Sequence, residues 1–545
     1  MKRAVALAIV VLTAASASVD AAEIVADYEV IPLPRKVMPG RGLPFSLNSK
    51  TVITVPKGDR VLKRNAQLLA GYLKDLTGIS PRIVTDIRES NAIRLSAELN
   101  NSNKEAYELN VGKNLITIDG SSAAGNFYGI QTLRKSIGKP AKKGDEVIFP
   151  AVTVSDAPRF GYRGGHLDTA RYYFTVDSVK RYIDMLALHN INRFHWHMTE
   201  DQGWRFESKK YPLLTEIGSK RAQTVIGRNS GKYDGKPYGG FYSQKDAREI
   251  VKYAADRHIT VIPEIDLPGH MVAALAAYPE LGCTGGPYKV KESWGVMDDV
   301  LCAGNDKTYK FIEDILNELM DVFPSEYIHI GGDECPKVRW EKCPKCQAKI
   351  KELGIVGDER STAEQKLQNH VMETAAKVLA SRGRKMIGWD EILEGGLFPG
   401  ATVMSWRGTE AAAQAAKEGY DAILTPTSYC YLDYYQSDDH SKEPLGIGGN
   451  LPIEKVYSLE PVAPELTPEQ SKHILGAQCN VWSEFIPHFS HAEHMALPRM
   501  AAISEVQWTE PEQKDLEGFL KRLPQLVNIY RNEGYNYAKY IPQAQ

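Results

Sequence analysis

The chain has 545 residues, of which 25% are charged and 43% are apolar, as in an ordinary soluble globular protein. This length exceeds one ordinary domain and predicts two or three. The 66 basic and 68 acidic residues leave a formal net charge of −2, which argues against a nucleic-acid partner because such a binder needs a basic surplus.

The first 22 residues, MKRAVALAIVVLTAASASVDAA, have the pattern of a secretory signal peptide. Two basic residues precede an apolar run from Ala4 to Leu12 that is too short to span a membrane. Small residues follow, and cleavage is expected after Ala17 or Ala22. No later apolar stretch is long enough to cross a bilayer, so we expect an exported chain, periplasmic or secreted, without a membrane span.

Residues 23–155 are predicted to form a small α+β domain that carries no obvious reactive constellation. The segment 61–78 repeats apolar residues at helical spacing and ends on Gly78, a favourable helix terminus. Two alternating segments separated by the turn residues Gly-Lys-Asn predict a hairpin. A second helix is expected at 123–137, and the stretch 154–165 predicts a linker into a new domain.

Residues 156–545 alternate short apolar strands with helical patterns. Helices are expected at 177–190, 244–258 and 361–383, and a last helix at 517–534 is expected to close the domain. The expected strands are 162–168, 191–198, 259–266, 327–333, 384–390, 401–407, 421–426 and 474–482. Eight alternations at this length predict an α/β fold, a (β/α)8 TIM barrel catalytic domain behind the small α+β N-terminal domain.

Polar and aromatic side chains follow every predicted barrel strand. In such barrels the catalytic face is built from the carboxyl ends of the strands. These ends carry Arg171, His197, Asp201, Asp266, His270, Asp333, Glu334, Trp389, Asp390, Trp406, Arg407, Tyr431, Asp433, Trp482 and Glu484. The convergence of acids, arginines and three tryptophans predicts an acid-lined site with aromatic walls.

Asp333 and Glu334 stand side by side in the segment YIHIGGDECPKVRW. An isolated acid pair would be expected to be solvated and to cap the next helix. Here Gly331 and Gly332 allow another group to approach the backbone, and alternation along a strand predicts that the two carboxylates point in opposite directions. Ordinary glycosidases hold two carboxyl groups about 5 Å or more apart, on opposite sides of the bond. A neighbouring pair instead suits a substrate that brings its own nucleophile, such as a 2-acetamido oxygen.

Other residues at the strand ends have two interpretations each. His195 and His197 share one strand face, a spacing also found in metal-dependent barrel hydrolases, but the other strand ends offer no complete set of ligands. We therefore expect the two histidines to be hydrogen-bonded residues that either line the site or stand behind it, and no metal in the site. A single Trp in a strand usually belongs to the core, whereas three at strand ends suit a box around a sugar ring. Arg171 would by itself be a surface ion pair, but its planar fork of donors suits sugar hydroxyls.

The seven cysteines stand at 283, 302, 335, 343, 346, 430 and 479, so at least one is unpaired within a monomer. Cys283 and Cys302 are candidates for a loop-closing disulfide in an exported chain. The Cys-Pro-Lys-Cys segment from Cys343 to Cys346 resembles half of a zinc knuckle, but no second Cys/His pair follows it downstream. Together with Cys335 this segment could bind a metal or form a local disulfide. We expect a structural role without a metal.

Five motifs follow one another along the chain: HWHMTEDQGWR, PEIDLPGH, HIGGDE, MSWRG and NVWSE. In these motifs and in their order the chain resembles the family 20 glycoside hydrolases, the β-N-acetylhexosaminidases. The resemblance runs from about residue 23 to the C-terminus and includes the small domain in front of the barrel. It implies that Glu334 is the general acid/base and that Asp333 and Tyr431 orient the acetamido group of the substrate. It also implies a pocket wall of Trp389, Trp406 and Trp482, contacts to the sugar hydroxyls from Arg171, Asp433 and Glu484, and a hydrogen-bonded relay of His270 and Asp201 that supports Glu334.

The resemblance implies an exo-acting retaining enzyme that acts on a carbohydrate with a terminal β-linked GlcNAc or GalNAc and needs no cofactor. Catalysis would be assisted by the substrate and would pass through an oxazoline intermediate. Alternatives are a disaccharide-releasing relative of the lacto-N-biosidase type, a carbohydrate-binding relative without activity, and a metal-dependent barrel hydrolase. The preferred sugar, the natural glycan and the oligomeric state stay open.

Overall fold

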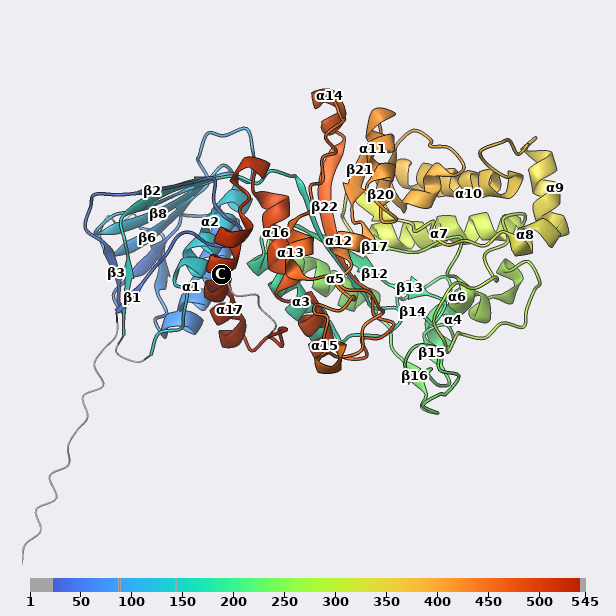
Figure 1. Ribbon diagram of the computed structural model, residues 1–545, viewed down its shortest axis with the longest axis horizontal. Coiled ribbons are helices and arrows are strands. Elements are labelled where there is room, and N and C mark those ends of the chain that lie inside the picture. The colour runs from blue at the N-terminus through green and yellow to red at the C-terminus, as the bar shows by residue number, and fades with distance from the viewer. Residues whose placement is uncertain (1–22, 87, 89, 143–144, 540–545) are drawn as a thin grey trace, which may run out of the picture.

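The computed structural model describes residues 23–539 except residues 87, 89, 143 and 144, and it contains two domains in contact (Figure 1). The segment for which a signal peptide is expected, 1–22, lies outside the described residues. Within the described ranges, no helix combines the length and the apolar character needed to cross a membrane.

The N-terminal domain is built on a mixed seven-stranded sheet with the strand order β2-β10-β7-β8-β6-β4-β5. A second sheet has three strands in the order β1-β9-β3, and helices α1 and α2 pack together beside the larger sheet. The elements are β1 (Glu23–Val25), β2 (Lys36–Pro39), β3 (Phe45–Leu47), β4 (Val52–Thr54), α1 (Arg60–Thr77), β5 (Arg82–Val84), β6 (Ala92–Ser96), β7 (Tyr107–Val111), β8 (Leu115–Gly120), α2 (Ala123–Ser136), β9 (Glu146–Phe149) and β10 (Val152–Asp156).

The local predictions for this domain are confirmed in most respects. Helix α1 ends at Gly78, which adopts a left-handed conformation (φ 71°) and donates its N–H to the carbonyl of Lys74. Strands β7 and β8 form the predicted antiparallel hairpin. The predicted linker is shorter than expected, because residues 154–156 belong to β10 and the first barrel strand begins at Tyr162.

The second domain is a closed barrel of eight strands whose neighbours all pair in parallel, as predicted. The strands in barrel order are β11 (Tyr162–Asp168), β12 (Arg193–His197), β17 (Thr260–Glu264), β18 (Tyr327–His329), β19 (Lys385–Trp389), β20 (Ala401–Ser405), β21 (Asp421–Leu424) and β22 (Ile474–Val481). They are almost wholly buried, because helices cover the outside and side chains fill the inside.

Helices follow the strands in the order that the sequence predicts. They are α3 (Val176–Leu188), α4 (Leu213–Glu216), α5 (Gln244–Ala255), α6 (Val272–Ala277), α7 (Asp306–Val322), α8 (Val338–Lys342), α9 (Pro344–Glu352), α10 (Ala363–Ala380), α11 (Glu410–Lys417), α12 (Thr427–Cys430), α13 (Ile453–Tyr457), α14 (Pro468–Ser471), α15 (Phe489–Ala496), α16 (Arg499–Trp508) and α17 (Leu516–Asn532). Two small hairpins, β13 (Thr199–Glu200) with β14 (Gly203–Trp204) and β15 (Lys220–Arg221) with β16 (Tyr238–Gly239), extend the loops after β12.

The last helix does not close the barrel as expected. Helix α16 packs on β11 and β22, whereas α17 lies against α2 of the N-terminal domain (Figure 1). Arg163 of β11, 1% exposed, joins the two domains by a forked contact to Glu105, with nitrogen–oxygen distances of 2.7 and 3.0 Å. The small domain therefore supports the side of the barrel, and the carboxyl ends of the strands are left to the loops.

Candidate active site

A pocket of about 190 Å³ lies at the carboxyl ends of the barrel strands. All nine residues predicted to act on or contact the substrate line it, together with three that the sequence did not single out. Its lining consists of Arg171, Asp333, Glu334, Trp389, Trp406, Thr427, Tyr431, Asp433, Tyr434, Ile447, Trp482 and Glu484. Residues from strand ends and loops spread over more than 300 positions of sequence therefore meet at one place.

The adjacent acids Asp333 and Glu334 follow a left-handed turn and do not extend the strand. Strand β18 ends at His329, and Gly331, Gly332 and Glu334 all have positive φ, at 67°, 102° and 43°. The expectation that strand alternation separates the two carboxylates is therefore wrong. The turn separates them, and its two glycines supply backbone angles that other residues adopt only at a cost.

The same glycines are also needed for space. A Cβ atom at Gly331 would lie 1.7 Å from the Oδ1 atom of Asp266, and one at Gly332 would lie 2.8 Å from the Cε atom of Met372. The Gly332 N–H donates to Asp266 Oδ1 at 3.3 Å, and its carbonyl accepts from Gln368 at 2.6 Å. The turn that carries the two acids is thus fixed from both sides.

His270 stands behind the acid pair, as predicted. Its Nε2 atom lies 3.5 Å from Glu334 Oε2 and 3.7 Å from Asp333 Oδ2. Its Nδ1 atom lies 3.2 Å from Asp201 Oδ2 and 2.6 Å from Glu200 Oε1. Burial lowers the pKa of His270, but these carboxylates outweigh it and hold that pKa well above its usual value. A cationic imidazole therefore faces both acids.

Glu200 is a site residue that sequence reasoning missed. It is 2% exposed, and its Oε2 atom lies 2.9 Å from Nη2 of Arg171, so one carboxylate holds both Arg171 and His270. The motif HWHMTEDQGWR contained the signal, since Glu200 and Asp201 are neighbours, but only Asp201 was selected from it. Asp201 forms a hydrogen bond with the Nδ1 atom of His270 at 3.2 Å and also accepts the N–H of Val272 at 2.9 Å.

Asp333 is a buried acid with a raised pKa. It is 15% exposed at its side chain, and its buried Oδ1 atom has no protein partner. Burial raises the pKa of Asp333 to about 6, because the attraction of His270 only partly offsets the burial and the neighbouring carboxylates Glu264 and Glu334. Its unpaired oxygen faces a pocket in which a ligand can supply a donor.

Four aromatic rings form the wall of the pocket. Trp389 and Trp482 have ring centroids 5.8 Å apart, and Tyr431 lies 6.3 Å from Trp482. Tyr431 also stacks on Trp406 at 6.4 Å, with 24° between the ring planes. Such faces suit the apolar C–H surface of a sugar ring or a methyl group.

Three charged groups line the pocket beyond the aromatic box. Arg171 is held by Asp168 at 3.3 Å and lies 3.8 Å from Glu484. Asp433 is 2% exposed, and neither of its carboxylate oxygens has a protein partner. Burial and the nearby Glu484 raise the pKa of Asp433 well above its usual value. A buried carboxyl group without partners is costly unless a ligand donates hydrogen bonds to it.

Glu334 lies at the boundary between this pocket and an outer hollow of about 360 Å³. Its side chain is 40% exposed, the most open of the acids around His270. The outer hollow is also lined by Glu391, which accepts the indole N–H of Trp406 at 2.9 Å. Burial and the charge of Asp333 raise the pKa of Glu391 to about 8. Glu391 was not selected from the sequence, where nothing distinguishes it from a surface acid.

The histidines of the second strand are hydrogen-bonded, as expected, and they stand behind the pocket without lining it. His195 Nε2 lies 2.9 Å from Glu264, a fully buried carboxylate that also accepts the indole N–H of Trp389 at 2.9 Å. His197 Nδ1 lies 3.1 Å from Asp168. These pairs lie inside the barrel, and they position Trp389 and, through Asp168, Arg171.

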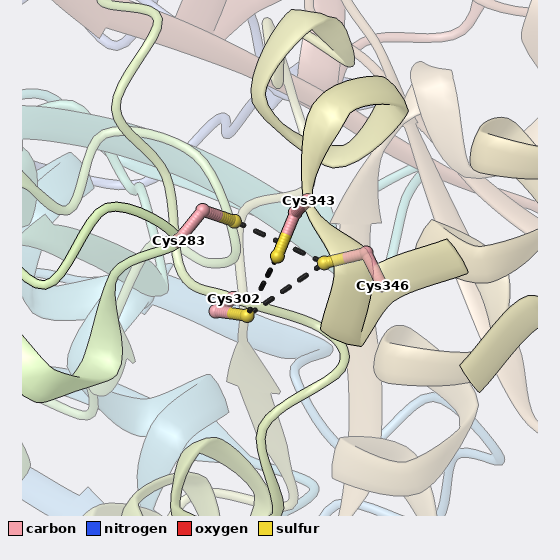
Figure 2. Close-up of side chains that lie close together, drawn as sticks. All are labelled: Cys283, Cys302, Cys343 and Cys346. Atoms are coloured by element: carbon pink, nitrogen blue, oxygen red, sulfur yellow. Dashed lines mark hydrogen bonds between the residues drawn. The ribbon is translucent and has the colours of Figure 1, made fainter. Parts of the chain in front are cut away.

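The cysteines are arranged differently from the expectation. Cys283 and Cys302 do not form a pair of their own, because both meet Cys343 and Cys346 in one cluster (Figure 2). All seven cysteines are thiols, and Cys335 is not a member of the cluster. The sequence offered no second cysteine pair downstream of Cys343 and Cys346. Cys283 and Cys302, which lie upstream, provide that pair.

Comparisons with known proteins give one family for both domains. A family model described as "Glycosyl hydrolase family 20, catalytic domain" matches residues 160–511, and one described as "Glycosyl hydrolase family 20, domain 2" matches residues 27–157. A "Beta-N-acetylhexosaminidase" of Cellulomonas fimi is 33% identical, and the match covers 94% of this chain and 96% of that relative.

A "Beta-hexosaminidase" of Porphyromonas gingivalis is 42% identical over 521 residues, which is 94% of this chain and 65% of the relative. The chain therefore spans just under two thirds of the length of that relative. Among solved structures, a GH20 beta-N-acetylhexosaminidase from Streptomyces coelicolor A3(2) superposes with a TM-score of 0.81 at 31% identity, covering 94% of this chain and 98% of that one.

Proposed function

The chain belongs to glycosyl hydrolase family 20, and we propose that it is an exo-acting, retaining β-N-acetylhexosaminidase. In this proposal it removes a terminal β-linked GlcNAc or GalNAc from the non-reducing end of oligosaccharides or glycoconjugates. The nucleophile is the acetamido oxygen of the substrate, because family 20 hydrolases are an exception to the mechanism with two flanking carboxylates.

The observation that carries this proposal is the placement of Asp333 and Glu334 on one turn, beside one nitrogen of His270. Two carboxylates that reach the same imidazole nitrogen from one turn are poorly placed to hold a glycosidic bond between them. Glu334 borders the outer hollow, where a leaving group has room, and Asp333 faces the aromatic box. This arrangement supports a division of roles between the two acids.

In the first step Glu334 donates a proton to the glycosidic oxygen, and the bond from that oxygen to C1 breaks. The acetamido oxygen forms a bond to C1 from the opposite face, which gives an oxazoline ring with a positive charge. The carboxylate of Asp333 stabilises this charge, and Tyr431 helps to orient the amide. Such preorganised charge is effective because the box excludes water.

In the second step the carboxylate of Glu334 removes a proton from water. The water oxygen bonds to C1 on the face that the leaving group vacated, and the bond from C1 to the amide oxygen breaks. The acetamido group is restored and C1 keeps its configuration. Glu334 ends protonated, ready for the next substrate.

Exo action is supported by the closed inner end of the pocket. Asp433 is buried with both oxygens unpartnered, which suits hydroxyl groups of a terminal sugar. Glu484 separates the pocket from another hollow of about 390 Å³, so a further sugar beyond the terminal one meets side chains and not open groove.

A panel of chromogenic β-glycosides of GlcNAc, GalNAc, glucose and a disaccharide tests the proposal. We expect rapid hydrolysis of the two N-acetyl sugars and strong competitive inhibition by a thiazoline analogue of the intermediate. Rapid cleavage of the glucoside, which has no acetamido group, would refute substrate assistance. Release of the disaccharide as the only product would instead favour a lacto-N-biosidase type of activity, and hydrolysis of amide or ester substrates that a chelator abolishes would favour a metal-dependent hydrolase.

We also propose that the chain is exported by the signal peptide expected at 1–22. The support is its sequence alone, a basic start followed by a short apolar run and small residues. Mass spectrometry of the protein purified from cells and from medium should find a mature N-terminus after Ala17 or Ala22, and an intact N-terminus in both fractions would contradict export by cleavage.

A further inference from the structure

Four cysteine sulfurs from two separate loops meet below the surface, away from the pocket (Figure 2). Cys283 and Cys302 come from the connection between α6 and α7, and Cys343 and Cys346 from the start of α9. Three of the four side chains are buried and the fourth, that of Cys283, is partly buried. All four sulfurs lie within 4.8 Å of one another.

Three of the six sulfur–sulfur distances match the edges of a coordination tetrahedron, and the other three are at most 4.8 Å. The sulfur–sulfur distances are 3.8 Å for Cys283 to Cys346, 3.7 Å for Cys302 to Cys343 and 3.7 Å for Cys302 to Cys346. Thiolates at the usual zinc–sulfur distance of about 2.3 Å form a tetrahedron with edges of about 3.8 Å. A disulfide requires about 2.05 Å between its sulfurs.

Three sulfur–sulfur contacts of nearly equal length link all four cysteines of the cluster. Cys302 and Cys346 each have two sulfur neighbours at nearly equal distance, so the arrangement does not divide into two pairs. Equal contacts around a common centre are expected of ligands to one ion, whereas two disulfides would bring each sulfur closer to one partner than to the others.

We propose that Cys283, Cys302, Cys343 and Cys346 bind one structural zinc ion as four thiolates. Zinc suits a closed set of four sulfur ligands, and it has no redox chemistry that would disturb them. The segment Cys-Pro-Lys-Cys has the C-x2-C spacing of a zinc knuckle.

The local backbone is built for this approach. A Cβ atom at Gly304 would lie 2.1 Å from the carbonyl carbon of Lys345, so only glycine lets the loop after Cys302 pack directly on the knuckle. Pro344 stands at the first position of α9 and fixes the turn between the two knuckle cysteines.

The zinc ion would join the loop before α7 to the chain segment that leaves the acid pair. Other contacts join the same two segments, since the indole N–H of Trp340 donates to the carbonyl of Leu301 at 2.9 Å and Arg339 pairs with Asp299 at 2.8 Å. Only eight residues separate Glu334 from Cys343. The ion would therefore stabilise the outer side of the active site without touching the substrate.

Metal analysis of the full-length chain, purified without an affinity tag, chelator or reductant, tests the site. We expect about one zinc per chain in the natural protein and in the control variant Cys430→Ser, which alters a buried cysteine outside the cluster. The double variant Cys343→Ser/Cys346→Ser is expected to lose at least nine tenths of the zinc.

Two further measurements on the natural protein keep the test decisive if that double variant fails to fold. Alkylation in denaturant with chelator but no reductant should modify all seven cysteines, because zinc keeps the four ligands reduced. Replacement of zinc by Co²⁺ should give the strong visible bands of a tetrahedral thiolate site. If the purified chain contains no zinc and its four cluster cysteines resist alkylation, they form disulfides and the proposal is overturned. One iron ion per chain in place of zinc would also overturn it. None of these readouts depends on glycosidase activity.

Discussion

Glu200 offers a test of the reasoning, because the structure and not the sequence identified it. Its Oε1 atom accepts the N–H of Asp201 at 3.0 Å, and its carboxylate forms ion pairs with His270 Nδ1 at 2.6 Å and with Arg171 Nη2 at 2.9 Å. In the variant Glu200→Gln the side chain keeps its shape but loses its charge and one acceptor. An amide NH2 group then faces either Arg171 or His270, donor against donor.

The size of the effect follows from these contacts. A hydrogen bond between charged groups contributes about 1.5–3 kcal/mol, so the loss of one in the transition state lowers kcat/KM by about 10- to 150-fold. Loss of the ion pair between Glu200 and Arg171 should raise KM, because Arg171 lines the pocket. Loss of the charge beside His270 should lower kcat, because His270 then loses its proton more easily.

The pH profile separates this positioning role from a general loss of structure. The proposed mechanism requires Asp333 to be an anion, and its pKa is raised to about 6, so kcat/KM of the natural enzyme should fall as the pH drops through about 6. A neutral His270 no longer lowers the pKa of Asp333. The loss of the Glu200 charge acts the other way, but its effect on Asp333 is smaller than that of His270. The acid limb of the variant should therefore move to higher pH by about one to two units.

The assay is kcat and KM for a chromogenic GlcNAc glycoside from pH 4 to 9, with circular dichroism and thermal unfolding to check the fold. Glu249→Gln serves as the matched control, because Glu249 is an exposed acid whose partner is Lys180 on a neighbouring helix. A folded Glu200→Gln variant with kcat/KM within threefold of the natural enzyme and an unmoved acid limb would refute the role given to Glu200.

Four further variants test the roles of residues in the pocket and in the outer hollow. Glu334→Gln should slow the hydrolysis of glycosides with poor leaving groups by about 10²- to 10⁴-fold and that of dinitrophenyl glycosides far less, whereas Asp333→Asn should slow the hydrolysis of both. Equal losses of rate for all leaving groups in Glu334→Gln would contradict the role of Glu334 as general acid. Asp433→Asn should weaken kcat/KM for GlcNAc glycosides by about 10- to 150-fold but change little for the deoxy analogue that lacks its hydroxyl partner, and an equal loss for every deoxy analogue would contradict that contact. Glu391 has a folded-state pKa of about 8, above its unfolded value, so the natural protein should lose stability as the pH rises from about 5 to 8, and Glu391→Gln should remove that loss; thermal midpoints that run parallel at all pH values would contradict the raised pKa.

The sequence predicted the barrel and most of its site because a (β/α)8 fold makes position along the chain informative. Once the eight strands are recognised, Trp389 is placed at the carboxyl end of the barrel as the last residue of β19, and Asp433 is placed there by the loop that follows β21. The order of the strands in the barrel is also the order in the chain. All nine predicted contact residues consequently line one pocket.

The features that were missed depend on contacts between loops. Glu200 and Asp201 are equally good acids in sequence, and only the path of the hairpin β13–β14 decides that Glu200 reaches both His270 and Arg171. The cysteine cluster was missed for the same reason. Cys283 and Cys302 precede the knuckle by some 40 to 60 residues, and no periodic pattern connects two irregular loops across that distance.

The turn after β18 explains why adjacent acids can do different work. A positive φ at a residue such as Glu334 costs about 1–3 kcal/mol and persists only where the surroundings determine it fully. Upstream, Gly332 is held by Asp266 and Gln368, so the turn cannot relax toward the barrel. Downstream, the segment from Cys335 to Cys346 is held to the loop before α7, through Trp340 and through the cysteine cluster. Glu334 is therefore held out over the mouth of the pocket while Asp333 stays inside it, and this separation is what a mechanism with one proton donor and one charge stabiliser requires.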